Sequence, residues 1–289
     1  MTHPKIPFAK LHGAGNDYVL VAEADLPANA NLPELSRAMS DRRKGIGSDG
    51  LIVVRASAKG AARMEMYNSD GSRSAMCGNG LRLVAKFLAD RGELRGDAAI
   101  LESDAGLHDV ALERRGGSVV GARVGMGEPS GEMSRIPVAD PNARIGPGGF
   151  PTIAVGAARA TCLSMGNPHC VLFVDDVARA PVDTLGPTLE RDPRFAERTN
   201  VEFAQVRSRG EILERTWERG AGETLACGSG ACAAAVAAIA AGLADPRVIV
   251  RQRGGDLEVE WRPGGAVHLS GPAQLSFIGV WEPGAALAG

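Results

Sequence analysis

The chain has 289 residues, of which 44% are hydrophobic, so it can build one large or two ordinary domains around buried cores. Its 32 basic and 34 acidic residues nearly balance, which argues against general nucleic-acid binding because that function needs a strongly basic surface. The first residues lack the apolar core of a signal peptide, and no apolar run is long enough to span a bilayer. We therefore expect a cytoplasmic protein that binds neither nucleic acid nor membranes.

Hydrophobic patterning predicts mostly strands, with a few helices placed between them. The expected elements in chain order are strands at 6–11 and 18–22, a helix at 33–44 that ends at Gly45, strands at 51–54 and 62–67, a helix that follows Cys77 and ends at Gly92, hairpins at 110–124 and 257–270 on either side of a helix that follows Cys227, and a last strand at 274–281. Both helices that follow a cysteine are apolar on most sides, which is typical of buried helices.

Five cysteines are an odd number, and none of them has a Cys-x-x-Cys or other zinc-binding spacing. This pattern predicts free thiols in a reducing compartment and no metal site. Cys162, Cys170 and Cys232 lack a glycine-flanked position before a helix, and we expect them to be core or incidental residues.

An internal repeat relates the two halves of the chain. Cys77 matches Cys227 at an offset of 150 residues, and the glycines one and three positions after each cysteine match as well. Asn16 matches Asn167 at an offset of 151. Because the matches keep their order at a nearly constant offset, we expect two similar domains whose matching residues meet at a shared cleft.

The repeat and the short connections between strands favour one fold class. We predict an α+β fold of two pseudo-symmetric domains from an internal duplication, each a mixed, largely antiparallel sheet or barrel around a central helix. The expected N-terminal domain comprises 1–125 and 273–289 and carries Cys77. The C-terminal domain, 126–272, carries Cys227, and the active site lies in the cleft between the domains.

Each repeated cysteine stands immediately before a helix, with glycines beside it. The N-terminus of a helix offers unpaired N–H groups and a partial positive charge, so it can hold a carboxylate and lower the pKa of a cysteine placed there. Two such helix ends sharing one carboxylate would place a sulfur on each face of the adjacent carbon. This arrangement suits removal of a proton from one face and delivery to the other, as in racemisation of an α-amino acid. The chain has no Gly-x-Gly-x-x-Gly before a helix of a βαβ unit and no P-loop, so we expect no nucleotide cofactor.

Several stretches resemble diaminopimelate epimerase. They are His12-Gly-Ala-Gly-Asn-Asp-Tyr18, Gly45-Ile-Gly-Ser-Asp49, Asn68-Ser-Asp-Gly71, Cys77-Gly-Asn-Gly80, Met165-Gly-Asn-Pro-His169, Asn200-Val-Glu202, Glu218-Arg-Gly220 and Glu223-Thr-Leu-Ala-Cys-Gly-Ser-Gly230. The resemblance implies cofactor-independent interconversion of LL- and meso-2,6-diaminoheptanedioate, for lysine and peptidoglycan synthesis in a bacterial cytoplasm. It also implies a homodimer.

The same resemblance implies roles for individual residues. Cys77 and Cys227 would be the base and the acid, and His169 and Glu218 would tune their pKa values. The remaining implied contacts are the reacting carboxylate at the backbone of Gly78, Asn79, Gly228 and Ser229, the reacting ammonium at Glu218 and the Arg219 backbone, and the distal end of the substrate at Asn16, Asn68, Asn167, Asn200 and the Arg219 side chain. Gly50 departs from the pattern, because some relatives carry a glutamine there that reaches the substrate.

Simpler interpretations remain open for several of these residues. The two repeated cysteines are alternatively buried structural thiols, Asn16, Asn68 and Asn200 are alternatively turn residues, and Glu218 with Arg219 is alternatively a surface ion pair. His169 alternatively satisfies a loop backbone. Competing functions are racemisation of a smaller amino acid, as in proline racemase-like relatives, a thiol redox role, and amino-acid binding without catalysis.

Overall fold

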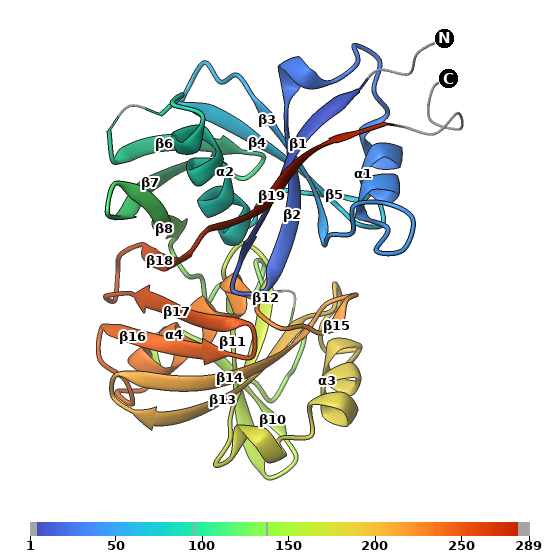
Figure 1. The fold of residues 1–289 in the computed structure, drawn as a ribbon. Helices are drawn as coiled ribbons and strands as arrows, with labels where there is room; N and C mark the ends of the chain where they lie inside the picture. The colour runs from blue at the N-terminus through green and yellow to red at the C-terminus, as the bar shows by residue number, and fades with distance from the viewer. Residues whose placement is uncertain (1–4, 95, 137, 283–289) are drawn as a thin grey trace. The chain divides into compact units, whose positions relative to one another are not determined.

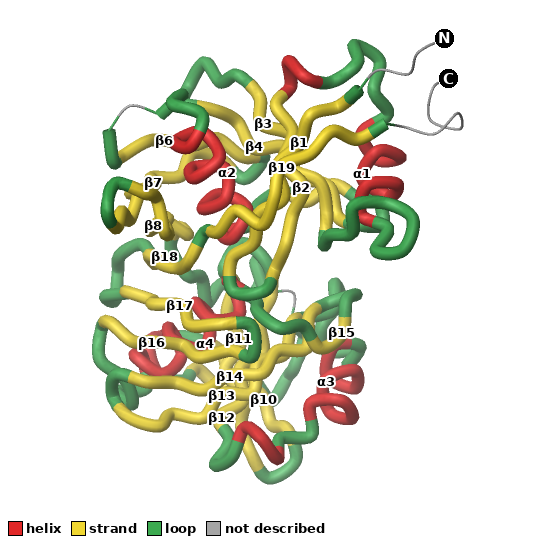
Figure 2. Tube along the Cα trace, in the orientation of Figure 1, coloured by secondary structure: helices red, strands yellow, loops and turns green. Residues whose placement is uncertain are grey.

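The computed structural model describes residues 5–94, 96–136 and 138–282 (Figures 1 and 2). The chain forms two compact units, which are called unit 1 (1–124 with 271–289) and unit 2 (125–270). No helix among the described residues is both long enough and apolar enough to cross a membrane.

Unit 1 is built on one mixed sheet. Its elements are β1 (Ile6–Gly13), β2 (Asn16–Ala22), η1 (Glu23–Asp25), α1 (Leu32–Ser40), β3 (Gly50–Arg55), β4 (Ala62–Asn68), β5 (Arg73–Ser74), α2 (Gly78–Asp90), β6 (Ala98–Ser103), β7 (Gly106–Arg115), β8 (Ser118–Gly127) and β19 (Gln274–Trp281). The strands pair in the order β19–β1–β2–β3–β4–β6–β7–β8, and the pairs β2/β3 and β4/β6 are parallel while the others are antiparallel.

Unit 2 has the same plan. Its elements are β9 (Arg144–Ile145), η2 (Pro147–Gly149), β10 (Pro151–Val155), β11 (Ala158–Ser164), β12 (Pro168–Phe173), η3 (Val177–Arg179), α3 (Val182–Glu190), β13 (Asn200–Ser208), β14 (Glu211–Glu218), β15 (Gly222–Glu223), α4 (Gly228–Ala240), β16 (Arg247–Gln252), β17 (Gly255–Glu260) and β18 (Val267–Pro272). The order is β9–β10–β11–β12–β13–β14–β16–β17–β18, with β12/β13 and β14/β16 parallel.

The two sheets repeat each other strand by strand. From β2 to β8, and from β12 to β18, neighbouring strands pair in the same succession: parallel, antiparallel, parallel, antiparallel, antiparallel. The first parallel pair sets Tyr18 beside Gly50 in unit 1 and His169 beside Asn200 in unit 2. Residue equivalence therefore follows offsets of 151 and 150, and the predicted α+β fold of two similar halves is confirmed.

Each sheet wraps around one central helix, as predicted. The helix α2 contacts β1, β2, β4, β6 and β7, and α4 contacts β11 to β14, β16 and β17. Most side chains of α4 are alanines, and nine of its residues are buried, from Gly230 to Ala238. Small side chains let the strands approach the helix closely on every side.

The strand and hairpin predictions are confirmed, apart from small shifts of the ends. Gly116 and Gly117 form the β7–β8 turn with φ of 57° and 83°, a conformation that favours glycine. β19 returns to unit 1, where it runs antiparallel to β1 from Ile6 opposite Trp281.

The helix expected at 33–44 is wrong at its C-terminal end, because α1 ends at Ser40. Asp41 ends it: its Oδ1 accepts hydrogen bonds from the backbone N–H groups of Arg43 (2.7 Å) and Lys44 (2.9 Å). Such a local side-chain turn competes with helix continuation, even where the following residues have helix-compatible composition.

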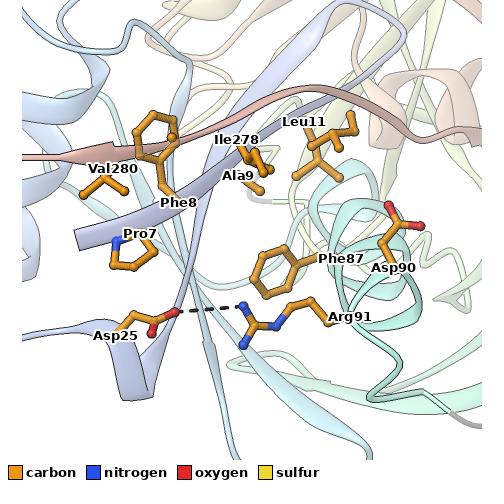
Figure 3. A pocket seen from close by; sticks show the side chains of 12 residues that line it. Pro7, Phe8, Ala9, Leu11, Asp25, Phe87, Asp90, Arg91, Ile278 and Val280 are labelled. Atoms are coloured by element: carbon orange, nitrogen blue, oxygen red, sulfur yellow. Dashed lines mark ion pairs between the residues drawn. The ribbon is translucent and has the colours of Figure 1, made fainter. Parts of the chain in front are cut away.

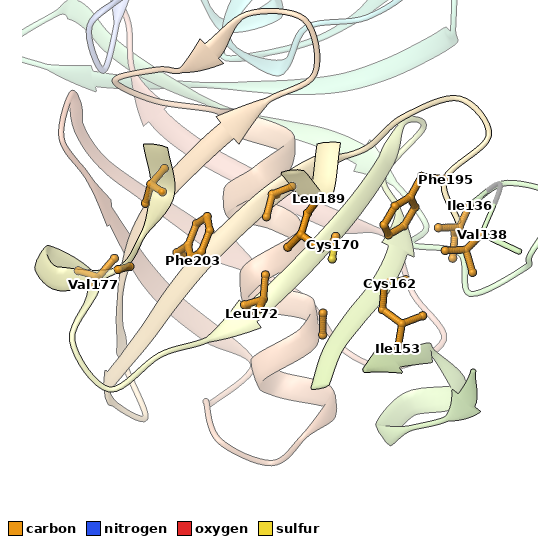
Figure 4. Packing of buried hydrophobic residues seen from close by; sticks show 14 residues of the cluster. Ile136, Val138, Ile153, Cys162, Cys170, Leu172, Val177, Leu189, Phe195 and Phe203 are labelled. Atoms are coloured by element: carbon orange, nitrogen blue, oxygen red, sulfur yellow. The ribbon is translucent and has the colours of Figure 1, made fainter. Parts of the chain in front are cut away.

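The buried cluster between the sheet and α3 in unit 2 contains two of the other three cysteines (Figure 4). Cys162 and Cys170 face each other across β11 and β12, and both are fully buried beside Phe203. Cys232 is fully buried in α4. All three are free thiols in core positions, as predicted.

Candidate functional site

Both repeated cysteines cap a central helix. Cys77 Sγ accepts a hydrogen bond from the Gly80 N–H at 3.3 Å at the start of α2, and Cys227 Sγ accepts one from the Gly230 N–H at 3.4 Å at the start of α4. Both cysteines have extended backbone, with φ of −148° and −129°, which is typical of N-cap residues. Each sulfur therefore lies where the helix dipole and unpaired N–H groups act on it.

The first two residues of each helix are those expected to bind the reacting carboxylate. Gly78 and Asn79 open α2, and Gly228 and Ser229 open α4. The N–H groups of a first helical turn have no carbonyl partner within the helix, so they can donate to an anion.

The structure brings two predicted asparagines together near the start of α2. Asn79 Nδ2 donates to the backbone carbonyl of Asn16 at 2.9 Å and to its Oδ1 at 2.7 Å. Asn16 Nδ2 in turn donates to Asp49 Oδ2 at 2.9 Å. The Tyr18 hydroxyl completes this group, because it accepts a hydrogen bond from the Cys77 thiol at 3.9 Å.

Asn68 is tied to a turn in the structure. It ends β4, and its Nδ2 donates to Ser72 Oγ at 2.9 Å across the loop that leads to β5. This is the contact that the turn interpretation of Asn68 predicts. Asn68 lies opposite Gly50 in the β3–β4 register.

A chain of side chains runs from Cys227 to a buried carboxylate in unit 2. Cys227 Sγ lies 3.6 Å from Ser229 Oγ, which accepts from Asn167 Nδ2 at 3.5 Å. Asn167 Oδ1 lies 3.0 Å from His169 Nε2, and His169 Nδ1 lies 2.7 Å from Glu202 Oε1. His169 and Glu202 are both fully buried. His169 thus contacts side chains rather than a loop backbone.

Glu218 is a further side chain that interacts with the same cysteine. It accepts hydrogen bonds from Thr224 Oγ1 at 2.5 Å and from the Cys227 thiol. Burial raises the pKa of Glu218, and these two hydrogen bonds oppose that rise.

Asn200 organises the turn beside Glu218. Its Oδ1 accepts from the Arg219 backbone N–H at 2.9 Å, and its Nδ2 donates to the Pro168 carbonyl at 2.9 Å. The exposed Arg219 side chain donates to the Glu197 carbonyl at 3.0 Å. Since Glu218 and Arg219 each have these other partners, the geometry does not favour a surface ion pair between them.

The pKa of Cys227 corrects one expectation. Burial, followed by the charges of Glu218 and Glu202, raises the pKa of this thiol well above its usual range. The hydroxyl of Ser229 and the Gly230 N–H lower it, but by less. The lowered pKa expected for a cysteine at a helix N-terminus is therefore not found at Cys227, because desolvation outweighs the dipole.

Comparison with known proteins identifies the family. The family model for diaminopimelate epimerase matches residues 8–131 and 161–276. The chain belongs to the diaminopimelate epimerase family. A diaminopimelate epimerase from Moorella thermoacetica is 47% identical over 274 residues, covering 94% of this chain and 98% of that protein. One from Pelotomaculum thermopropionicum is 46% identical over 276 residues, covering 95% of this chain and 98% of that protein.

Solved structures with low sequence identity share the fold. A hydroxyproline epimerase from Agrobacterium vitis superimposes with a TM-score of 0.68 at 14% identity, covering 99% of this chain and 94% of that chain. A phenazine biosynthesis protein from Bacillus anthracis has the same TM-score and identity, covering 96% of this chain and 99% of that chain. These likenesses show that the diaminopimelate epimerase family fold recurs in distant proteins.

In this family member the structure adds Glu202 to the site, a residue of the stretch Asn200-Val-Glu202 for which the sequence predicted no role. The spacing of Asn200 and Glu202 could have indicated this role. Glu202 follows Asn200 by two residues in β13, and residues two apart in a strand face the same side of the sheet. A charged residue on the buried face of a strand needs a partner, and here that partner is His169.

A hollow of about 520 Å³ lies on unit 1 (Figure 3). Apolar side chains of β1, β19 and α2 line it, among them Phe8, Phe87 and Ile278. Asp25 and Arg91 form an ion pair of 4.0 Å beside it. None of the predicted site residues lines this hollow.

Proposed function

We propose that this protein epimerises LL-2,6-diaminoheptanedioate to the meso isomer, without a cofactor, in the synthesis of lysine and peptidoglycan precursors in the cytoplasm. One observation carries this proposal: in two similar units, a cysteine caps the N-terminus of the central helix. The names of the relatives that are 46–47% identical supply the substrate.

In the proposed mechanism, Cys77 and Cys227 act on opposite faces of one α-carbon. One sulfur, as a thiolate, removes the α-proton, and the other, as a thiol, delivers a proton to the opposite face. The raised pKa of Cys227 keeps its proton on, which suits the donor role and leaves Cys77 as the base. The roles exchange in the reverse direction.

In this mechanism the N-termini of α2 and α4, which carry partial positive charge, stabilise the carbanion formed when the α-carbon loses its proton. We propose that the reacting carboxylate binds the N–H groups of Gly78, Asn79, Gly228 and Ser229. These donors offset the negative charge that develops when the neighbouring carbon loses its proton. Their positions are set by the helices, so little reorganisation is needed during the reaction.

The remaining polar groups would hold the rest of the substrate. Glu218 and the Arg219 backbone would bind the reacting ammonium, and His169 and Glu218 would tune the cysteines. The distal amino-acid end would be held by Asn16, Asn68, Asn167, Asn200 and the Arg219 side chain. An arginine suits a carboxylate because its guanidinium donates two parallel hydrogen bonds.

Proton NMR of LL-diaminoheptanedioate in deuterated water tests the proposal, with wild type, Cys77→Ala and Cys227→Ala run in parallel under reducing conditions. We expect wild type to exchange the α-proton and form the meso isomer, and both variants to lose epimerisation. Absence of exchange in the reduced wild type would exclude this substrate. The same assay with proline and other amino acids would then test the racemase alternative.

We also propose that the protein is a homodimer that uses the apolar face of unit 1. The β19 side chains Leu275, Ile278 and Val280 are exposed beside the hollow of Figure 3, with 45–75% of their surface accessible. A cluster of exposed apolar side chains on one strand is typical of an interaction surface. A second copy suits this face, because a twofold axis brings the same patch against itself.

A further inference from the structure

Tyr18 occupies in unit 1 the position that His169 occupies in unit 2. Both lie in the strand that runs parallel to the next one, and their register partners, Gly50 and Asn200, are also equivalent. Each side chain also belongs to the polar group around its unit's helix-capping cysteine. The repeat therefore gives each cysteine a neighbour from the same strand position, a phenol in one unit and an imidazole in the other.

The Tyr18 side chain is held firmly in this position. Only 5% of its surface is exposed. Gly50 leaves the space for it, since a Cβ at that position would lie 3.0 Å from Tyr18 Cε1 and 2.2 Å from the Tyr67 carbonyl. The glycine that replaces the glutamine of some relatives thus accommodates the ring that reaches Cys77.

The groups around the Tyr18 hydroxyl favour the neutral phenol. Burial, the neighbouring Cys77 and the charge of Asp49 raise the pKa of Tyr18 well above its usual range, while a hydrogen bond with Asn16 opposes the rise. Asp49 is itself engaged by Arg42 at 2.9 Å. Tyr18 therefore keeps a proton to donate across the pH range in which a cysteine ionises.

We propose that Tyr18 is a positioning residue for Cys77. When Cys77 is a thiol, its S–H donates to the Tyr18 hydroxyl, as in the structure. When Cys77 ionises, the Tyr18 hydroxyl rotates and donates a hydrogen bond to the thiolate. This hydrogen bond stabilises the thiolate at its partly buried position and fixes the direction of the sulfur. Its consequence for catalysis rests on the proposed function, whereas the interaction itself does not.

Tyrosine NMR tests the interaction in the wild-type chain. The protein has two tyrosines, Tyr18 and Tyr67, so labelling with ¹³C at Cζ gives two signals. We expect the Tyr18 signal to shift with pH at the midpoint at which Cys77 becomes reactive to iodoacetamide, and Cys77→Ser to abolish that shift. Tyr67, which donates to Glu65 Oε1 at 2.6 Å, is the internal control and should not follow Cys77. A Tyr18 signal that ignores the ionisation of Cys77 would overturn the proposal.

Tyr18→Phe tests the energetic consequence, because it keeps the ring and removes the hydroxyl. We expect the midpoint for Cys77 alkylation, followed by mass spectrometry of the Cys77 peptide, to rise by about one pH unit, so that alkylation at neutral pH slows about tenfold. Tyr67→Phe is the matched control and should leave the midpoint in place. Equal midpoints in wild type and Tyr18→Phe would disprove the role.

The epimerase assay then separates this proposal from the proposed function. In Tyr18→Phe we expect kcat to fall about tenfold with KM unchanged, because the hydroxyl acts through Cys77 rather than on the substrate. If wild type shows no α-proton exchange, the proposed function fails, but NMR and alkylation still report whether Tyr18 holds Cys77. If exchange occurs and Tyr18→Phe matches wild type in all three measurements, only the role of Tyr18 fails.

Discussion

Ile52 and Glu202 occupy equivalent positions beneath the first turns of the two central helices. Ile52 Cδ1 lies 3.1 Å from where a Cβ on Gly80 would be, and Glu202 Oε1 lies 3.1 Å from where a Cβ on Gly230 would be. The β3/β4 register pairs Ile52 with Met66, and the β13/β14 register pairs Glu202 with Thr216.

The environments of the two cysteines therefore differ although the backbones repeat. The first turn of the helix that follows Cys77 packs against Ile52 and Met64, whereas the first turn of the helix that follows Cys227 packs against Glu202. The carboxylate contributes to the raised pKa of Cys227 after burial and Glu218. Ile52 and Met64, which lie beneath the first turn of α2, carry no charge. This difference gives the two halves of a symmetric fold different chemistry.

Removing Glu202 should destabilise the fold through His169. Glu202→Leu leaves His169 Nδ1 buried without its partner, so we expect the free energy of unfolding to fall by about 3 kcal/mol. Adding His169→Phe should recover part of that loss, because both partners are then apolar. Urea unfolding of the two single variants and the double variant measures the coupling. Strictly additive losses would contradict a direct interaction between the two side chains.

Glu214 should make stability fall as the pH rises. Burial, with a contribution from Glu202, raises its pKa from 4.5 to about 8. Below pH 4.5 the Glu214 carboxyl is protonated in both the folded and the unfolded chain. Between pH 4.5 and about 8 only the folded chain holds it, so the unfolding free energy declines by about 1.4 kcal/mol per pH unit. We expect Glu214→Gln to remove this decline in urea titrations at pH 5 and pH 8. Glu128→Gln, at an exposed position, should behave like wild type, and an unchanged pH slope in Glu214→Gln would refute the assignment.

Gly186 should tolerate no side chain. A Cβ there would lie 2.8 Å from both Cβ and Cγ of Trp217, whose Nε1 donates to Glu190 Oε2 at 2.9 Å. We expect Gly186→Ala to cost about 1–3 kcal/mol in thermal or urea unfolding, because overpacking shifts α3 or the indole. Gly210→Ala is the control, since nothing lies within 4 Å of the added Cβ. Equal stability of the two variants would show that this contact is not tight.

A charge on β19 should dissociate the proposed homodimer. Ile278 is 75% exposed next to the hollow of Figure 3, and burying an aspartate there against a second copy would cost several kcal/mol. We expect wild type to sediment as a dimer and Ile278→Asp as a monomer. Ile145→Asp, at a site in unit 2 that is 76% exposed, should remain dimeric. A dimeric Ile278→Asp would place the interface elsewhere.

Local sequence signals were enough to locate most strands, both central helices and the cysteines that cap them. Alternation of apolar residues and glycine turns act over a few residues, so they can be read without the fold. The end of α1 was missed because one side chain, Asp41, captures two backbone N–H groups that the helix would otherwise use. Nor did spacing alone show that Asn68 contacts the Ser72 side chain.

The sequence by itself determined the duplication, the fold class and the pair of helix-capping cysteines, because these depend on periodicity and on short motifs repeated 150 residues apart. Only the tertiary structure decided which side chains surround each cysteine. Tyr18 reaches Cys77, which is 59 positions away, because α2 packs against β2. Glu202 comes with His169 into the group around Cys227 because β12 and β13 pair in parallel. Burial in that environment reverses the pKa shift expected for Cys227 from its helix position alone, since desolvation depends on packing that no local pattern records.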